Sequence, residues 1–374
     1  MCCHLFLLLA SCIPTFANQP IRLTAGDGPY AVAAADITQD GRPDIVASNR
    51  IDSTISVFFN TGAGTFATPA VLPNAGITVN PEGLTIADVI GTDTFPDIIV
   101  ANNGDNSIVV YKGTGAGGFA APVRVAAIAT SAPHDVAVSN IDGQRGNDIV
   151  AACNDGNVRV LLQDAGANTF TVASTLGVGG IPISVVLANL DGIKNDDIIV
   201  ASTGADEIRI FLNDGNGVFP VAASQIIPTA AGRLLPQSVA AGDVSGDGFP
   251  DVVVAYTGSS NIGVLLNDGK GVVAAPFFLT PGVAPRAVRL ADINNDGKLD
   301  ILYTSNAGNS FGYFRNTGNN VFVHQGPIAI PQLVAVNPAP IGITTADINA
   351  DGTADVIIAE NAIDRVDVFT TSCP

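Results

Sequence analysis

The stretch from Asp292 to Asp300, DINNDGKLD, carries oxygen-bearing side chains at positions 1, 3, 5 and 9. A hard divalent cation such as Ca²⁺ takes about six to eight oxygen ligands, and calcium loops supply them from alternate positions, with a carbonyl at position 7 and a glycine at position 6. Position 6 here is Gly297. We therefore predict a calcium site made by Asp292, Asn294, Asp296, Asp300 and the carbonyl of Lys298.

Six further copies of this stretch occur along the 374 residues, roughly fifty residues apart. The copies begin at Asp36, Asp88, Asn140, Asn189, Asp243 and Asp347. A repeat with a period of that size is typical of a propeller or a solenoid. The repeat extends from about residue 19 to the end of the chain, so the sequence predicts one repetitive domain rather than two or three ordinary ones.

Two further landmarks divide each unit into strands. A proline lies seven residues before each copy, and a glycine-rich turn such as NTGAGTF follows it in most units. The prolines are Pro29, Pro81, Pro133, Pro182, Pro236, Pro285 and Pro340. In the first unit these landmarks separate strands at about 30–36, 44–48, 55–60 and 65–72. Four strands per unit predict an all-β, seven-bladed β-propeller.

The two ends of the chain predict how the ring closes. The last unit stops after its third strand, and the segment 19–25 (QPIRLTA) has no unit of its own. We therefore expect residues 19–25 to supply the outer strand of the seventh blade.

Three other copies keep the pattern of oxygen ligands. The seventh unit supplies Asp347, Asn349, Asp351, Asp355 and the carbonyl of Thr353; the fifth supplies Asp243, Ser245, Asp247, Asp251 and the carbonyl of Phe249; the first supplies Asp36, Asp40, Asp44 and the carbonyl of Arg42, with Thr38 as a weaker ligand. About four calcium sites are therefore expected. The alternative is that each loop is a polar hairpin whose aspartates cap its own backbone amides.

The remaining three copies depart from the pattern. In the second, one extra residue puts Asp93 and Asp97 out of phase with Asp88. The third and fourth begin with Asn and have Gln144 and Ile193 at position 5. We predict that these three turns hold no metal.

Charge excludes some partners. The formal net charge is −18, from 16 basic and 34 acidic residues. Nucleic acid and anionic membrane surfaces require a cationic face, so neither is an expected partner. After the first seventeen residues, no stretch approaches the ~18 consecutive apolar residues of a membrane span. A monomer is expected.

Residues 1–17, MCCHLFLLLASCIPTFA, form a short apolar block. The block resembles a secretory signal peptide cleaved after Ala17, which predicts a secreted or periplasmic propeller over 18–374. The alternative is a lipoprotein signal in which Cys12 is lipidated and anchors the protein at the cell surface. Either reading leaves Cys153 and Cys373 in the rest of the chain, and two such cysteines do not predict a disulfide framework.

The DxNxDGxxD loops, the runs GTFATP (64–69) and GGFAAP (117–122) and the period together resemble the FG-GAP family, also described as VCBS repeats. That family includes the integrin α-subunit propeller and many secreted bacterial proteins. The resemblance implies a seven-bladed propeller with calcium in a subset of blades, loops on the lower rim and partner binding on the upper face. The three altered loops and Val272-Val273, where a glycine-to-phenylalanine ending is expected, depart from the pattern.

The residue after each proline changes chemistry from unit to unit, whereas the framework around it repeats. Side chains that vary on a constant scaffold are typical of a binding site. We predict that Tyr30, Glu82, His134, Gln237 and Arg286 form a site for a protein or glycan ligand on the upper face. The alternative is that these residues are unrelated and face solvent.

A catalytic function is the competing hypothesis. Glu82, His134 and Arg286 carry groups that could act as acid, base and charge stabiliser in a secreted polysaccharide lyase or hydrolase. The chain has three histidines, one of them in the leader, and no GxSxG motif. A binding module without a catalytic motif is therefore the first prediction.

Overall fold

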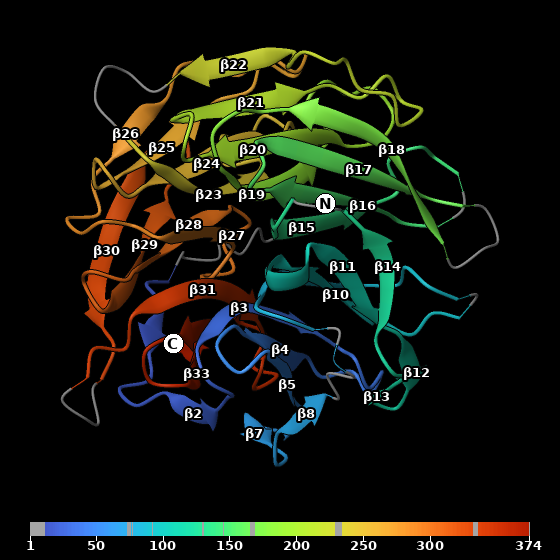
Figure 1. Ribbon diagram of the computed structural model, residues 1–374. Coiled ribbons are helices and arrows are strands. Elements are labelled where there is room, and N and C mark those ends of the chain that lie inside the picture. Colours follow the sequence, from blue (N-terminus) through green and yellow to red (C-terminus); the bar gives the residue numbers. More distant parts are fainter. Residues whose placement is uncertain are drawn as a thin grey trace, which may run out of the picture.

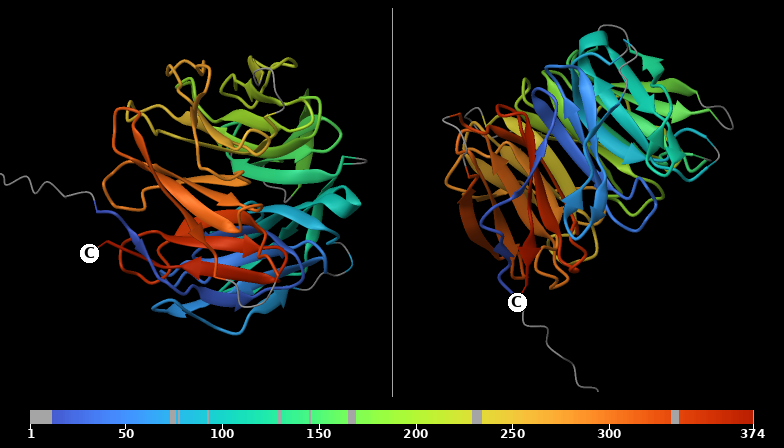
Figure 2. Two further views of the ribbon diagram at one scale, coloured as in Figure 1. Left: turned by 90° about the vertical axis from the view of Figure 1, so that its left-hand side faces the viewer. Right: turned by 90° about the horizontal axis from the view of Figure 1, so that it is seen from below.

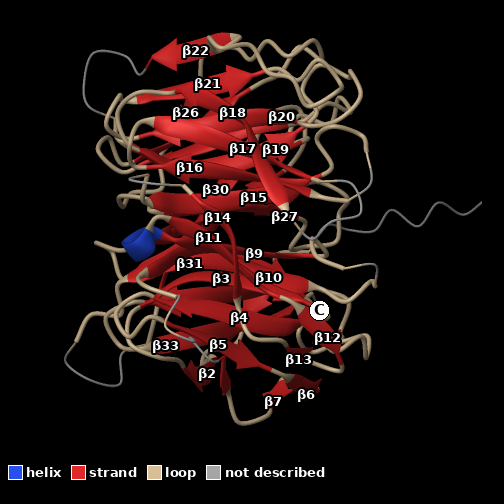
Figure 3. Cartoon of the chain, turned by 45° about the vertical axis from the view of Figure 1, so that its right-hand side comes forward, coloured by secondary structure: helices blue, strands red, loops and turns tan. Residues whose placement is uncertain are grey.

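The computed structural model describes residues 12–72, 76, 78–91, 93–128, 131–144, 146–164, 169–228, 234–331 and 336–373. Across these ranges the chain forms seven four-stranded antiparallel sheets arranged in a ring, which confirms the predicted seven-bladed propeller (Figure 1). Figure 3 shows strands in every blade and one short 3₁₀ turn, η1 (Asn103–Asp105). In the described part of the chain, no helix is long and apolar enough to cross a membrane.

The strands of each blade follow one another from the centre of the ring outwards. Blades 1 to 3 consist of β3 (Pro29–Ala35), β4 (Asp44–Asn49), β5 (Thr54–Phe58) and β8 (Ala70–Leu72); β9 (Pro81–Ala87), β10 (Asp97–Asn102), β11 (Ser107–Tyr111) and β14 (Val123–Ala127); and β15 (Pro133–Ser139), β16 (Asp148–Cys153), β17 (Asn157–Gln163) and β18 (Phe170–Gly177).

Blades 4 to 6 consist of β19 (Pro182–Ala188), β20 (Asp197–Ser202), β21 (Glu207–Phe211) and β22 (Gln225–Pro228); β23 (Pro236–Gly242), β24 (Asp251–Tyr256), β25 (Asn261–Leu265) and β26 (Phe277–Leu279); and β27 (Ala287–Ala291), β28 (Asp300–Ser305), β29 (Ser310–Asn316) and β30 (Phe322–Ala329). Blade 7 consists of β31 (Pro340–Ala346), β32 (Asp355–Glu360), β33 (Arg365–Phe369) and β2 (Ile21–Thr24).

The hydrophobic core lies between neighbouring blades. Every residue of the second strand of each blade is buried, because both faces of that strand are covered by adjacent sheets. Val46 and Val57 of blade 1, for example, share a cluster with Ile98 and Val100 of blade 2. The second strands therefore have apolar residues on both faces rather than a strict alternation.

The predicted fourth strand of the first unit is split. Residues 65–72 form β7 (Thr65–Phe66), which pairs with β6 (Asn60–Gly62), and then β8. Pro69 lies between the two pieces, and a proline has no N–H to donate to a strand partner. Blade 2 has a matching hairpin of β12 (Gly113–Gly115) and β13 (Gly118–Phe119).

The N-terminal strand closes the ring as predicted. Strand β2 pairs antiparallel with β33, and Leu23 on β2 lies opposite Val366. The first strands of blades 7 and 1, β31 and β3, also contact each other. Figure 2 shows the blue N-terminal segment beside the red strands of the last blade.

A second connection between the two ends was not predicted. Cys12 forms a disulfide with Cys373, with the two Cα atoms 5.7 Å apart. Next to it, β1 (Thr15–Phe16) pairs with β34 (Thr371–Ser372). The ring of Phe16 packs edge-on against Phe311, with centroids 5.3 Å apart. Residues 1–11 of the expected leader lie outside the described residues, but its last six residues are part of the folded propeller.

We predict that Cys373→Ser lowers the melting temperature, because the disulfide closes a span of 361 residues and such links typically contribute about 2–5 kcal/mol. Calorimetry of both proteins with and without reductant tests this. The reductant should lower the melting temperature of the wild type and leave that of the variant unchanged. Equal melting temperatures for the two oxidised proteins would contradict a stabilising link.

Candidate functional site

The two rims of the propeller carry different sets of loops. We call the rim that holds the acidic turns between first and second strands the lower rim, and the opposite rim the upper face. On the upper face, the loop after a second strand reaches the next blade: Asn361 Nδ2 donates to the carbonyl of Pro29 at 3.3 Å, and Thr257 Oγ1 to that of Pro285 at 2.5 Å. The approach to each proline therefore lies on the upper face.

One buried aspartate in each blade organises the lower rim. These are Asp44, Asp97, Asp148, Asp197, Asp251, Asp300 and Asp355, each at most 1% exposed. One carboxylate oxygen accepts the N–H of the second loop residue, as in Leu190 to Asp197 at 2.7 Å. The other accepts an N–H at the end of the third strand, as in Asn213 to Asp197 at 2.8 Å.

All seven blades make both contacts, including the three whose loops depart from the calcium pattern. Even with the extra residue in its loop, Asp97 occupies the same place. Burial raises the pKa of each of these carboxyl groups, to about 6 for Asp197 and Asp355 and to about 7 for Asp300. The position-9 aspartate thus connects three backbone segments in every blade.

The four loops predicted to bind calcium share a second pattern. The aspartate at position 1 accepts the N–H groups of positions 5 and 6, as in Asp292 with Asp296 at 3.1 Å and Gly297 at 2.7 Å. The aspartate at position 5 accepts the N–H of position 7, as in Asp296 with Lys298 at 3.1 Å. The same contacts occur at Asp36 and Asp40, Asp243 and Asp247, and Asp347 and Asp351.

The glycine at position 6 is required by its backbone. Gly297 has a φ of 82°, a left-handed conformation that residues with a Cβ rarely adopt. Nothing lies within 4 Å of a Cβ placed there, so conformation rather than space selects glycine.

The side chains at positions 1, 3 and 5 lie together in these loops. Ser245 Oγ is 3.3 Å from Asp243 Oδ1, and Asn349 Nδ2 is 3.0 Å from Asp351 Oδ2. Each cluster combines carboxylate, amide or hydroxyl oxygens, which is the ligand chemistry that Ca²⁺ prefers. Within the described ranges, no three His, Cys, Asp or Glu side chains form a group that could hold a metal ion on their own.

The upper face brings together the five residues predicted to form a ligand site. Arg286 Nη2 donates to the hydroxyl of Tyr30 at 3.1 Å, and Arg286 Nη1 donates to Gln237 Oε1. His134 Nδ1 is hydrogen-bonded to Glu82 Oε2. These contacts join side chains from blades 1, 2, 3, 5 and 6 around one opening, which we call the channel mouth.

Arg50 connects the two halves of this network, and the sequence analysis did not single it out. Its guanidinium lies over the ring of Tyr30, 5.2 Å from the centroid, and forms an ion pair with Glu82 at 3.5 Å. Arg50 lies in the loop between β4 and β5, which belongs to the upper face. A charged residue in such a loop was the available signal.

Backbone irregularities accompany the position after the proline in every blade except blade 6, which carries Arg286. In six blades the pairing of the first strand shifts directly after the proline, as between Pro133 and Asp135. A β-bulge re-aims the side chain at its position. Tyr30, His134, Gln237 and Arg286 line a cavity of about 540 Å³ at the centre of the ring, and Glu82 is 3% exposed beside it.

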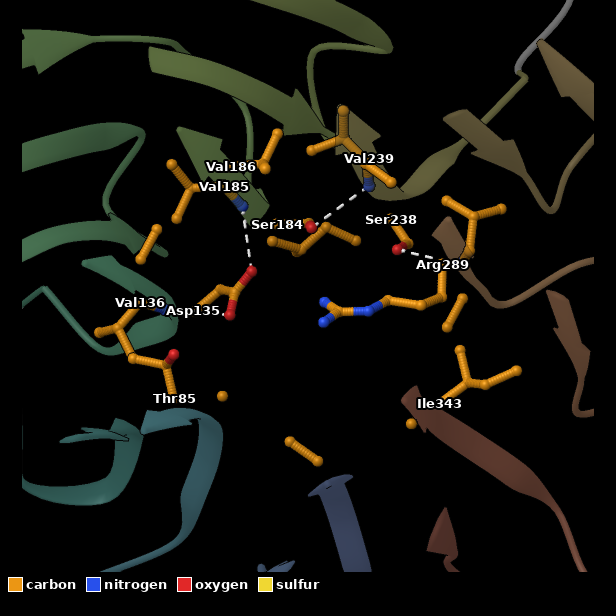
Figure 4. Close-up of a pocket in the computed structure, with 18 of the residues that line it drawn as sticks. Thr85, Asp135, Val136, Ser184, Val185, Val186, Ser238, Val239, Arg289 and Ile343 are labelled. Atoms are coloured by element: carbon orange, nitrogen blue, oxygen red, sulfur yellow. Dashed lines mark hydrogen bonds between the residues drawn. The ribbon is translucent and has the colours of Figure 1, made fainter. Parts of the chain in front are cut away.

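The wall of this cavity contains a second carboxylate, Asp135. Its oxygens accept the N–H groups of Val136 and Val185, each at 3.0 Å (Figure 4). Desolvation by the surrounding protein raises the pKa of Asp135 to about 6. The sequence analysis did not select this residue.

Comparison with known proteins agrees with this architecture. Three overlapping segments, 189–254, 243–303 and 292–358, match the FG-GAP-like repeat family. The chain is therefore a seven-bladed propeller scaffold that carries FG-GAP-like repeats. No match was found among curated protein sequences.

Several solved structures share the fold. Virginiamycin B lyase from Staphylococcus aureus superposes with a TM-score of 0.64 at 17% identity, over 96% of this chain and 99% of that one. BBS1N, solved in complex with ARL6DN, gives 0.62 at 12% identity, over 95% and 98%. An Agrocybe aegerita lectin that recognises non-reducing terminal N-acetylglucosamine gives 0.55 at 21% identity, over 82% and 79%. At these identities the likeness shows the fold alone.

The buried aspartates make stability depend on pH. An unfolded aspartate has a pKa near 3.9, whereas that of Asp197 is about 6 in the fold. The folded state therefore binds the proton of the Asp197 carboxyl more tightly than the unfolded state does. The contribution of Asp197 to the free energy of unfolding is largest below about pH 4 and is lost as the pH rises through about 6.

Denaturant unfolding of the wild type and Asp197→Asn at pH 4 and pH 7 tests this. From pH 4 to pH 7, we expect the free energy of unfolding of the wild type to fall by on the order of 2 kcal/mol more than that of the variant. Asp214→Asn, at an exposed position of a nearby turn, should show the same change in unfolding free energy between the two pH values as the wild type. If the free energy of unfolding changed equally with pH in the wild type and in Asp197→Asn, Asp197 would not titrate in this range.

Proposed function

We propose that the protein is a secreted, calcium-stabilised binding scaffold that takes a protein or glycan ligand at the channel mouth. The observation that carries the proposal is the continuous network of Gln237, Arg286, Tyr30, Arg50, Glu82 and His134. Polar and charged side chains from five blades converge there on one concave opening. Such a convergence at a large cavity is the usual form of a ligand site.

Calcium is the proposed structural ion of the lower rim. In the loops of blades 1, 5, 6 and 7, the clustered oxygens of positions 1, 3 and 5, the carbonyls of Arg42, Phe249, Lys298 and Thr353, and the position-9 carboxylates of Asp44, Asp251, Asp300 and Asp355 would hold it. The ion would neutralise carboxylates that lie close together, and would thereby stabilise the turn between the first two strands.

Export is supported by the disulfide, because such bonds persist mainly in oxidising compartments. The bond requires that Cys12 stay in the mature chain, so it favours processing before Cys12 over cleavage after Ala17. A lipidated Cys12 could not form this bond, so the disulfide and a lipid anchor at that residue exclude each other.

A second candidate function is a carbohydrate-active lyase or hydrolase. It is favoured by the hydrogen bond between His134 and the buried carboxylate of Glu82, because a carboxylate that orients an imidazole can make it a general base. Incubation with polysaccharides and detection of new chain ends tests it, with His134→Ala as the control. Chain cleavage that the variant lacks would favour the enzyme.

The calcium proposal is tested by Asp247→Ala with Asp191→Ala as a matched control. Each substitution removes one hydrogen bond that the aspartate accepts from the backbone N–H two residues later, at 3.0 and 2.8 Å respectively. Only Asp247 belongs to a predicted calcium loop. In millimolar calcium, Asp247→Ala should lose part of the calcium-dependent rise in melting temperature, and calorimetry should find about one ion fewer. Equal losses for both variants, with and without chelator, would contradict the ligand assignment.

The ligand site is tested on a glycan array with the double variant Tyr30→Phe and Gln237→Ala. We expect at least about tenfold weaker binding than the wild type, because two polar contacts of the mouth are lost. Lys270→Ala, in a turn of the lower rim, should bind like the wild type. Unchanged binding by the double variant would place the glycan site elsewhere, and no binding by the wild type would contradict a glycan ligand.

A further inference from the structure

One cationic side chain extends into the interior of the channel below the mouth. Arg289 lies on the innermost strand of blade 6, and Figure 4 shows it reaching into the middle of the opening, towards Asp135. Four other blades have a short side chain at the same distance after the proline, namely Thr85, Ala137, Val186 and Ala240, and these also line the cavity. The short residues leave the space into which the arginine extends.

Arg289 has no protein partner in the part of the chain that the structure describes. No hydrogen bond or ion pair joins its guanidinium to another side chain or to the backbone. Asp135 faces it, but the carboxylate oxygens of Asp135 accept the N–H groups of Val136 and Val185 instead. Arg289 is exposed to solvent within the opening, and the surrounding protein lowers the pKa of its guanidinium by partial desolvation. A guanidinium offers five N–H donors, so this site has donor capacity that the protein does not use.

Arg286 lies three residues before Arg289, nearer the mouth. It also has no acidic partner among the described residues. Its contacts are the neutral groups of Tyr30 and Gln237. Six other arginines each form an ion pair with a carboxylate, namely Arg42, Arg50, Arg124, Arg159, Arg209 and Arg365. In a chain of net charge −18, the cavity is therefore lined by two arginines that form no ion pair within the described residues, with Asp135 as the carboxylate that faces Arg289.

We propose that the channel binds a small organic carboxylate, which Arg289 holds through its planar fork and whose other end reaches Arg286 at the mouth. The proposal rests on the proposed binding function and names the chemical class of its ligand. The cavity of about 540 Å³ is of the size that small ligands occupy. Valine and isoleucine side chains such as Val186 and Ile343 line it and would contact the body of the ligand.

The test measures the binding of glucuronate, glucose and inorganic phosphate to the full chain by titration calorimetry. Glucuronate and glucose differ in the carboxylate, so the wild type should bind the acid and not the neutral sugar. Arg289→Gln should weaken glucuronate binding by about tenfold to one-hundredfold, the loss expected for a hydrogen bond between charged groups. Arg289→Lys should fall between the two, because an ammonium group lacks the planar fork.

Arg124→Gln is the control, since Arg124 pairs with Asp105 on an outer strand and not in the channel. Thermal unfolding of every variant shows whether it is folded. Undiminished glucuronate binding by folded Arg289→Gln, equal affinity for glucose, or no glucuronate binding by the wild type would each overturn the proposal. Binding of phosphate alone would likewise overturn the carboxylate class. Loss of array binding in the Tyr30 and Gln237 double variant but not in Arg289→Gln would leave the binding function standing and refute only this inference.

Discussion

The hydrogen bonds of one buried aspartate in each blade are the interaction on which the rest of the propeller depends. Each carboxylate holds the start of the acidic turn through one oxygen and the end of the third strand through the other. The first loop, the start of the second strand and the end of the third strand of a blade are thereby fixed to one another at the lower rim. A buried acceptor left without its donors costs about 1–3 kcal/mol, and so does each donor left without its acceptor. Because blades 2, 3 and 4 keep this aspartate without the full set of calcium ligands, its constancy in the repeat follows from backbone pairing rather than from metal binding.

Contacts between blades extend this order around the ring. Asparagines that begin the glycine-rich turns, such as Asn267 and Asn316, donate to the carbonyl of the second residue of the acidic loop in the preceding blade, at Leu190 and Val244, each at 2.8 Å. The same turns lie beside the buried aspartate of their own blade, since the N–H of Asn267 donates to Asp251 at 2.9 Å. The loops of the lower rim therefore form a network in which the glycine-rich turn of one blade contacts the acidic loop of the blade before it. A ring built in this way has one seam, and strand β2 together with the Cys12–Cys373 disulfide closes it.

The sequence was sufficient to predict the architecture because the same landmarks occur in all seven repeats. The prolines, the aspartates and the period determine the number of blades, the order of the strands and the closure by residues 21–24. Sequence reasoning failed where a contact joins residues that no repeat relates. Cys12 was assigned to a leader, so its bond to Cys373 was not considered. Asp300 and its equivalents remain predicted metal ligands, and what the sequence did not predict is their hydrogen bonds to backbone amides. Spacing shows which residues alternate, but it does not show which backbone amides surround a carboxylate. Arg50 and Arg289 occur once each, so periodicity could not single them out.

Positions that repeat build the framework, and positions that differ between blades carry the chemistry. The residue after each proline lies at a bulge in six blades, so its side chain leaves the regular alternation of the strand and enters the mouth. Changing that residue alters the site without disturbing the pairs on either side of it. The same holds deeper in the channel, where Arg289 replaces the short side chains of other blades on an otherwise equivalent strand. Six arginines outside the cavity form ion pairs with carboxylates, whereas Arg289 forms none among the described residues although it lines the cavity. A cation that lines a concave opening without an ion-pair partner can bind an anionic group of a ligand there, and this separates Arg289 from an unpaired cation on the outer surface.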